Sequence, residues 1–98
     1  MCKITVHNME SSRGNKVANQ FEIYGQDSNG EYFSIFQSYR TTIAKSTTHK
    51  GETKIFLDSN YWDYSRTTGK YRNQFLGEGI AETRKKIDSG EYTLINLN

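Results

Sequence analysis

The segment from Tyr61 to Phe75 has the side-chain chemistry best suited to recognising another molecule. It concentrates tyrosine, tryptophan, serine, threonine and arginine, and rings that supply area beside directed hydrogen-bonding groups are typical of protein-binding surfaces. In a competing structural interpretation, Trp62 anchors the core and the hydroxyl residues cap a helix. Arg66 and Arg72 are expected to be the most exposed members. The residues predicted to contact a partner are Tyr61, Trp62, Tyr64, Arg66, Lys70 and Arg72.

A second candidate surface is the basic cluster Arg84, Lys85 and Lys86. Residues 75–91 resemble a helix-turn-helix of the excisionase kind, with a glycine in the turn, a basic second helix and a Ser-Gly-Glu entry to a wing. The second helix of such a motif enters the major groove of DNA, where the three basic side chains would meet phosphates or guanine edges. Successive helical residues point about 100° apart, and acidic residues lie among the basic ones. A solvated charged helix is therefore the competing interpretation.

Residues suited to catalysis are few. The chain has two histidines: His7 ends a predicted strand without a partner nearby in sequence, and His49 lies in a predicted turn. The triplet 52–54, Glu-Thr-Lys, matches one half of a restriction-type nuclease pattern, but the region around it is strand-rich. Gly77 and Gly79 follow a predicted helix, whereas nucleotide-binding loops follow a strand. The sequence therefore predicts a protein that is not an enzyme, with no catalytic residue, metal site or cofactor.

These surfaces must be positioned by a small α+β fold. Alternation of apolar and polar residues predicts an antiparallel β-meander of about five strands, at residues 3–7, 20–26, 31–39, 41–46 and 53–57. Turn residues at 28–30 and 49–51 join two hairpins. Two short helices follow, one capped by Ser65 or Thr67 and ending at Gly77, the other at about 81–89. Residues 91–97 then form a final strand that could pair with the meander.

The alternation within the first hairpin also assigns side chains to faces. Phe21 and Ile23 share one face of their strand, and Phe33 and Ile35 share one face of the next.

Length and composition place the chain in one domain, residues 1–98, in which the polar stretch 8–19 is expected to be a flexible loop. Apolar residues make up only 34% of the chain, but 13% is aromatic, so a small aromatic-rich core is expected. The net charge of +2 is far from the strongly basic balance of most nucleic-acid binders. No apolar run approaches the roughly 20 residues of a membrane span, and the single Cys2 suits a reducing compartment.

Two segments resemble a group of uncharacterised small proteins encoded by tailed bacteriophages. Residues 38–44 read SYRTTIA, and residues 61–76 read YWDYSRTTGKYRNQFL. The pattern of the group is S-Y-x-T-x-I-A, a hairpin, and then W-x-Y-S-x-T-T-x-x-[HY]-x-x-x-F-L, with Tyr71 at the position that takes His or Tyr. The match spans residues 31–97. The resemblance implies a phage origin and an accessory role, and it brings no activity with it.

The expected function is that of a small phage-encoded accessory protein in the host cytoplasm, which binds a host protein, such as a defence protein, and modulates or inhibits it without catalysis. The alternative is a nucleic-acid-binding module that uses Arg84, Lys85 and Lys86. A third hypothesis is that the protein is a component of the virion or of its assembly. The exposed edges of the predicted sheet leave a homodimer open, and no membrane partner is expected.

Overall fold

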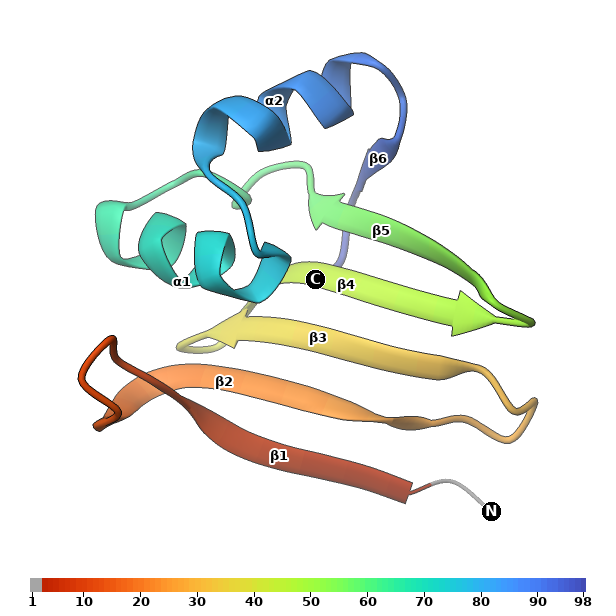
Figure 1. The fold of residues 1–98 in the computed structure, drawn as a ribbon, viewed down its shortest axis with the longest axis horizontal. Coiled ribbons are helices and arrows are strands. Elements are labelled where there is room, and N and C mark those ends of the chain that lie inside the picture. The colour runs from red at the N-terminus through yellow and green to blue at the C-terminus, as the bar shows by residue number, and fades with distance from the viewer. Residues whose placement is uncertain (1–2) are drawn as a thin grey trace.

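The computed structural model describes residues 3–98, which form one six-stranded sheet with two helices on one of its faces (Figure 1). Cys2 lies outside the described residues. Strands β1 to β5 form an antiparallel meander in sequence order, and the last strand pairs parallel with β5. The predicted α+β class is confirmed. In chain order, the elements are β1 (Lys3–Glu10), β2 (Lys16–Gln26), β3 (Tyr32–Ser38), β4 (Thr41–His49), β5 (Glu52–Asp58), α1 (Arg66–Leu76), α2 (Ile80–Asp88) and β6 (Tyr92–Ile95).

The hairpin turns form where the turn residues predict them. In the turn after β2, the Asp27 carboxylate accepts backbone N–H hydrogen bonds from Asn29 at 2.9 Å and from Glu31 at 3.0 Å. Lys50 and Gly51 both have positive φ, 52° and 81°, as a two-residue hairpin turn with the twist of its strands requires. These two turns set the register of the meander.

The loop predicted over residues 8–19 is wrong. β1 continues to Glu10 and β2 begins at Lys16, so only a tight turn separates the two strands. That turn is closed by a 2.8 Å hydrogen bond from the Ser11 N–H to the Asn15 carbonyl. Strand pairing uses main-chain groups, so polar residues can take part in it, and the burial of Met9 holds this end of the hairpin against the core.

The first helix begins and ends as its capping residues predict. The Ser65 hydroxyl oxygen accepts the Thr68 N–H at 3.1 Å, and Gly77, with a φ of 73°, donates its N–H to the Asn73 carbonyl. After α2 the chain returns to the main sheet, since β6 pairs beside β5. Residues 91–97 therefore form no wing, and the resemblance of this region to a winged helix-turn-helix is not borne out.

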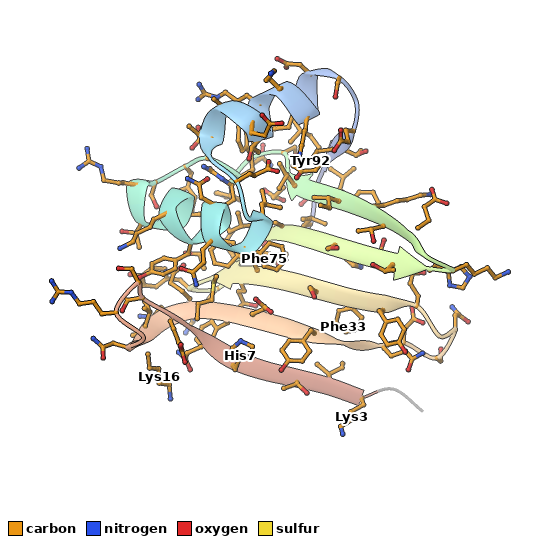
Figure 2. All side chains as sticks on the ribbon, in the orientation of Figure 1. Lys3, His7, Lys16, Phe33, Phe75 and Tyr92 are labelled. Carbon is orange, nitrogen blue, oxygen red and sulfur yellow. The ribbon has the colours of Figure 1, made fainter. Side chains whose placement is uncertain are left out.

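The core lies between the helices and the half of the sheet beneath them. Phe36, Ala44 and Leu57 are fully buried on this helix-side face, and the Phe75 ring of α1 stacks on Phe36 with centroids 6.0 Å apart. Figure 2 shows Phe75 and Tyr92 between the helices and the sheet. A register shift beside Phe36 lets the consecutive residues Ile43 and Ala44 both be buried, which regular alternation would forbid.

Candidate protein-binding surface

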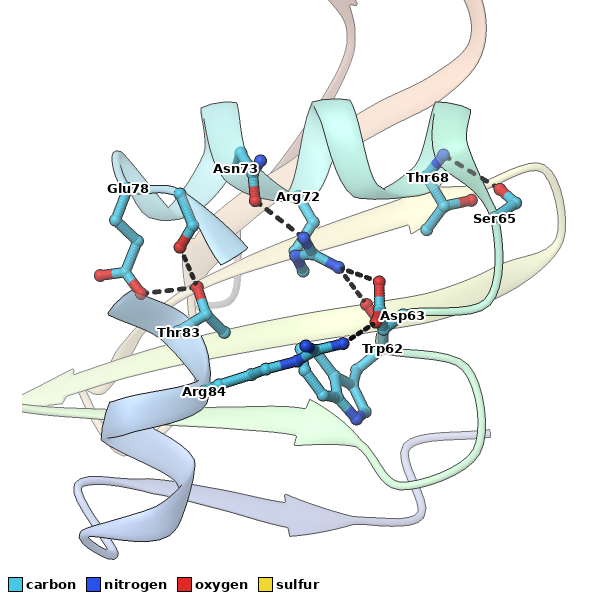
Figure 3. A network of polar contacts seen from close by, with 10 residues as sticks. Trp62, Asp63, Ser65, Thr68, Arg72, Asn73, Glu78, Thr83 and Arg84 are labelled. Atoms are coloured by element: carbon cyan, nitrogen blue, oxygen red, sulfur yellow. Dashed lines mark hydrogen bonds and ion pairs between the residues drawn. The ribbon is translucent and has the colours of Figure 1, made fainter. Parts of the chain in front are cut away.

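Arg72 is the centre of a polar network that fixes the connection between β5 and α1 (Figure 3). One terminal nitrogen donates to the Trp62 carbonyl at 2.9 Å and to the Asp63 carboxylate at 3.1 Å, and the other donates to the Asn73 side-chain oxygen at 2.8 Å. The guanidinium carbon lies 5.4 Å from the centroid of the Trp62 ring, within the range of a cation–π contact. Gly69, one turn earlier, lies beside the guanidinium. The network therefore holds the connection between β5 and α1 against the helix.

The exposure predicted for Arg72 is wrong. Arg72 was expected to be among the most exposed, but only 1% of its surface is accessible, and Trp62 is half-buried against the core. The reason is that a guanidinium can be buried when carbonyl and carboxylate groups accept hydrogen bonds from its terminal nitrogens, as they do here. The other four members are exposed. Tyr61 and Tyr64 pack edge to face with centroids 5.6 Å apart, and Arg66 and Lys70 lie on the first turns of α1.

The three basic residues of α2 do not act as one surface. Arg84 is exposed but pairs with Asp63 at 3.1 Å, and Lys85 is exposed. The Lys86 ammonium donates to the Glu78 carboxylate at 2.7 Å and lies 5.4 Å from the centroid of the Tyr92 ring. The helix thus presents separate cations, two of which are paired with acidic side chains.

Glu78 gathers three donors at the start of α2. Besides Lys86, the Tyr92 hydroxyl donates to it at 2.8 Å and the Thr83 hydroxyl at 2.7 Å. Burial alone would raise the pKa of Glu78, but these hydrogen bonds outweigh it and lower the pKa below its usual range. Burial and the bond to Glu78 raise the pKa of Tyr92 to about 12, and the same carboxylate raises the pKa of Lys86.

A second buried carboxylate, Asp58, holds the C-terminal residues. It accepts the N–H groups of Leu97, Asn60 and Tyr61. Burial favours a higher pKa for Asp58, but these hydrogen bonds prevail and lower it. Beyond Leu97, the side chain of Asn98 accepts a hydrogen bond from the Thr42 N–H on β4 and donates one to the Thr42 carbonyl. The C-terminal residues therefore pass the end of β5 at Asp58 and reach β4.

We predict that stability falls at both ends of the pH range. Carboxyl groups with lowered pKa values, Asp58 and Glu78, stabilise the fold above their ordinary values of 3.8 and 4.5, and this contribution is lost as the pH falls. A hydroxyl with a raised pKa, Tyr92, stabilises the fold below its ordinary value of 10.0, and this contribution is lost as the pH rises toward 12. Urea unfolding at a series of pH values should show a plateau from about pH 5 to 9. Glu78→Gln should flatten the acid limb, and an unchanged limb would contradict the role of Glu78.

The face of the sheet opposite the helices carries a continuous apolar surface. The strand register brings Val6, Ile23 and Ile35 side by side across β1, β2 and β3, and the row continues through Lys45 to Phe56. We call this the uncovered face. Its large apolar side chains on the first three strands are Ile4, Val6, Phe21, Ile23, Phe33 and Ile35.

These side chains are accessible although their strands alternate as if they were buried. Ile4 and Val6 are 60% and 58% exposed, and the other four are half-buried by one another. The helix-side face of the same strands holds mostly polar residues, including Thr5, Glu22 and Ser34. A sheet with one solvated face normally turns its apolar residues toward the core. Here β1 to β3 turn them away from the helices.

The residues of the uncovered face were missing from the candidate site, although the sequence carries their signal. Phe21 and Ile23 were correctly predicted to share a face, as were Phe33 and Ile35, but neither set was predicted to bind a partner. The register pairs Ile23 with Ile35 and so joins the two sets. The helices, however, pack on the other face, which the sequence does not reveal.

The polar half of the helix-side face forms a shallow trough beside the helices. His7 packs edge to face on Tyr24 with centroids 5.3 Å apart, and Lys3 and Tyr32 also line the trough. Figure 2 shows His7 on β1, away from the helices. The nearby Glu22, which also lines the trough, is paired in register with His7.

Within residues 3–98, no three histidine, cysteine, aspartate or glutamate side chains gather closely enough to hold a metal ion. In the same part of the chain, no helix has the length and apolar character needed to cross a bilayer.

Comparison with known proteins places the chain in a family without a described role. No curated protein and no solved structure matches it. One family model matches residues 4–91, which include the first five strands, both helices and the network around Arg72. Because that match covers most of the sequence, the chain belongs to DUF8033, a family of unknown function.

Proposed function

We propose that this protein is a non-catalytic binding module that docks on another protein chain through the uncovered face. The observation that carries the proposal is the alternation of β1 to β3, which turns aliphatic and aromatic side chains toward the face without helices. Exposed apolar surface of this extent on a small protein usually marks an interaction site. Burying it against a partner would remove about 25 cal/mol of unfavourable hydration per Å² of apolar surface.

The resemblance to phage proteins supports a narrower proposal, an accessory protein that alters a host protein. Tyr61, Tyr64, Arg66 and Lys70 would then form a second contact area at the helix side, where their rings and cations are accessible. Tyrosine and arginine are enriched at the energetic centres of protein interfaces. This area is smaller and less apolar than the uncovered face.

Site-specific photo-cross-linking tests the docking surface. A photoreactive phenylalanine analogue replaces Phe33, on the uncovered face, or Tyr32, its neighbour on the helix-side face. When the chain is produced in bacterial cells, irradiation should give a cross-linked protein adduct from position 33 and little from position 32. Adducts from position 32 or from Tyr61 alone, with none from position 33, would contradict the proposal.

Nucleic-acid binding through α2 is the second candidate, and the exposure of Arg84 and Lys85 is what favours it. Binding of this kind weakens steeply with salt because phosphate contacts release counterions. A mobility shift at low salt that disappears in the Arg84→Ala, Lys85→Ala double variant would support it. The absence of any shift with duplex or single-stranded DNA would remove it.

A further inference from the structure

We infer that the chain which covers the uncovered face is a second copy of this protein, in a twofold dimer whose two sheets pack face to face. The inference rests on the proposed function, because it names the occupant of the same surface. Three features of the face favour a second copy: its lack of charge at the centre, its area, and the position of its most apolar row.

The centre of the uncovered face is neutral. Between β1 and β3, its residues are the six apolar side chains together with Asn8, Gly25 and Gln37. The register places three charges on this face outside the first three strands: Lys45 on β4, and Glu52 and Lys54 on β5. Two copies can therefore meet over β1 to β3 without opposing like charges, which would cost several kcal/mol in an interface.

The exposed area of the chain exceeds that of an average monomer of its mass by about the area that each partner buries in an ordinary dimer. A folded monomer of 11.3 kDa is expected to expose about 5,700 Å², whereas this chain exposes 6422 Å². The excess is about 700 Å², close to the roughly 800 Å² that each partner buries in a standard interface. One face of one sheet supplies an area of this size.

The row Val6, Ile23, Ile35 gives the dimer its geometry. A twofold axis that lies between the sheets and runs parallel to β2, passing over Ile23, places β1 of one copy over β3 of the other. Ile23 then meets its own counterpart, and Val6 meets Ile35. Face-to-face sheets pack about 10 Å apart with interdigitating side chains. Lys45 and Lys54 stay at the rim, where their ammonium groups remain in water.

Charge complementation at Ile23 tests this geometry. Sedimentation equilibrium of the full chain at about 50 μM, a concentration at which an ordinary interface is occupied, should give twice the 11.3 kDa chain mass. Ile23→Lys and Ile23→Glu should each be monomeric, with self-association weakened about 100-fold or more. An equimolar mixture of the two should recover the dimer. Ser34→Lys, on the helix-side face, is the matched control and should remain dimeric, and circular dichroism should show that all variants are folded.

The outcomes separate this inference from the proposed function. A monomeric full chain that still gives adducts through position 33 with another protein would overturn the second copy and leave the docking surface in place. A dimer that Ile23→Lys does not dissociate would place the interface elsewhere, for example along the open edge of β1, and would overturn the inference. Recovery of the dimer only on mixing the Lys and Glu variants supports both the second copy and the axis at Ile23.

Discussion

Phe36→Ala is expected to lower the free energy of unfolding by about 4 kcal/mol, because it removes a fully buried ring and leaves a cavity. Phe36 lies on β3 beneath the helices and stacks on Phe75 of α1, so it joins the two layers of the fold. A domain of this size is stable by only about 5–15 kcal/mol. Urea unfolding followed by far-ultraviolet circular dichroism measures the loss.

Phe33→Ala is the matched control for Phe36→Ala, since it removes the same ring from the other face of the same strand. Both variants are made in a chain that carries Ile23→Lys, so that self-association does not contribute. Phe33 is only half-buried in the single chain, and its loss should cost less than about 1.5 kcal/mol. If the two variants lost equal amounts of unfolding free energy, the uncovered face would be part of the core of a single chain. That result would contradict the docking proposal.

Most of the fold could be predicted because its signals are local. The Asn29-Gly30 turn has a positive φ at Gly30 and the Lys50-Gly51 turn has one at both residues, a conformation that few residues adopt. The Ser65 and Gly77 caps fix the ends of α1 through hydrogen bonds within a few residues. Such signals depend little on the rest of the chain. The hairpin over residues 8–19 escaped prediction because its strands are paired through the backbone and carry few apolar side chains to reveal them.

The candidate site was predicted less well because its features are not local. Whether Arg72 faces water depends on the Trp62 carbonyl and the Asp63 carboxylate, which reach it only after the chain turns between β5 and α1. The alternation of β1 to β3 identifies the apolar side of each strand but not the side on which the helices pack. That choice follows from Phe36, Ala44 and Leu57, whose shared face becomes visible only in the assembled sheet.

Arg72→Ala is expected to lower the free energy of unfolding by about 3–5 kcal/mol, because a buried, paired cation is removed and its partners lose their donors. The Trp62 carbonyl and the Asn73 side chain would be left without their hydrogen bonds, while Asp63 would keep Arg84. Arg72→Lys should cost less, since it retains the charge but not the planar set of donors. Trp62 is the single tryptophan of the chain, so its fluorescence during urea unfolding reports directly on this network.

Arg66→Ala distinguishes a structural role for Arg72 from a role in recognition. Arg66 lies exposed at the start of the same helix, and its removal should change stability by less than about 0.5 kcal/mol. The Arg72 and Asp63 substitutions should also be non-additive, with a coupling of about 1–2 kcal/mol, because the two side chains share a hydrogen bond. If Arg72→Ala instead unfolded at the same urea concentration as Arg66→Ala and reduced photo-cross-linking to a partner, Arg72 would be a contact residue in solution. A buried guanidinium cannot give that result, since both of its terminal nitrogens already donate hydrogen bonds within the chain.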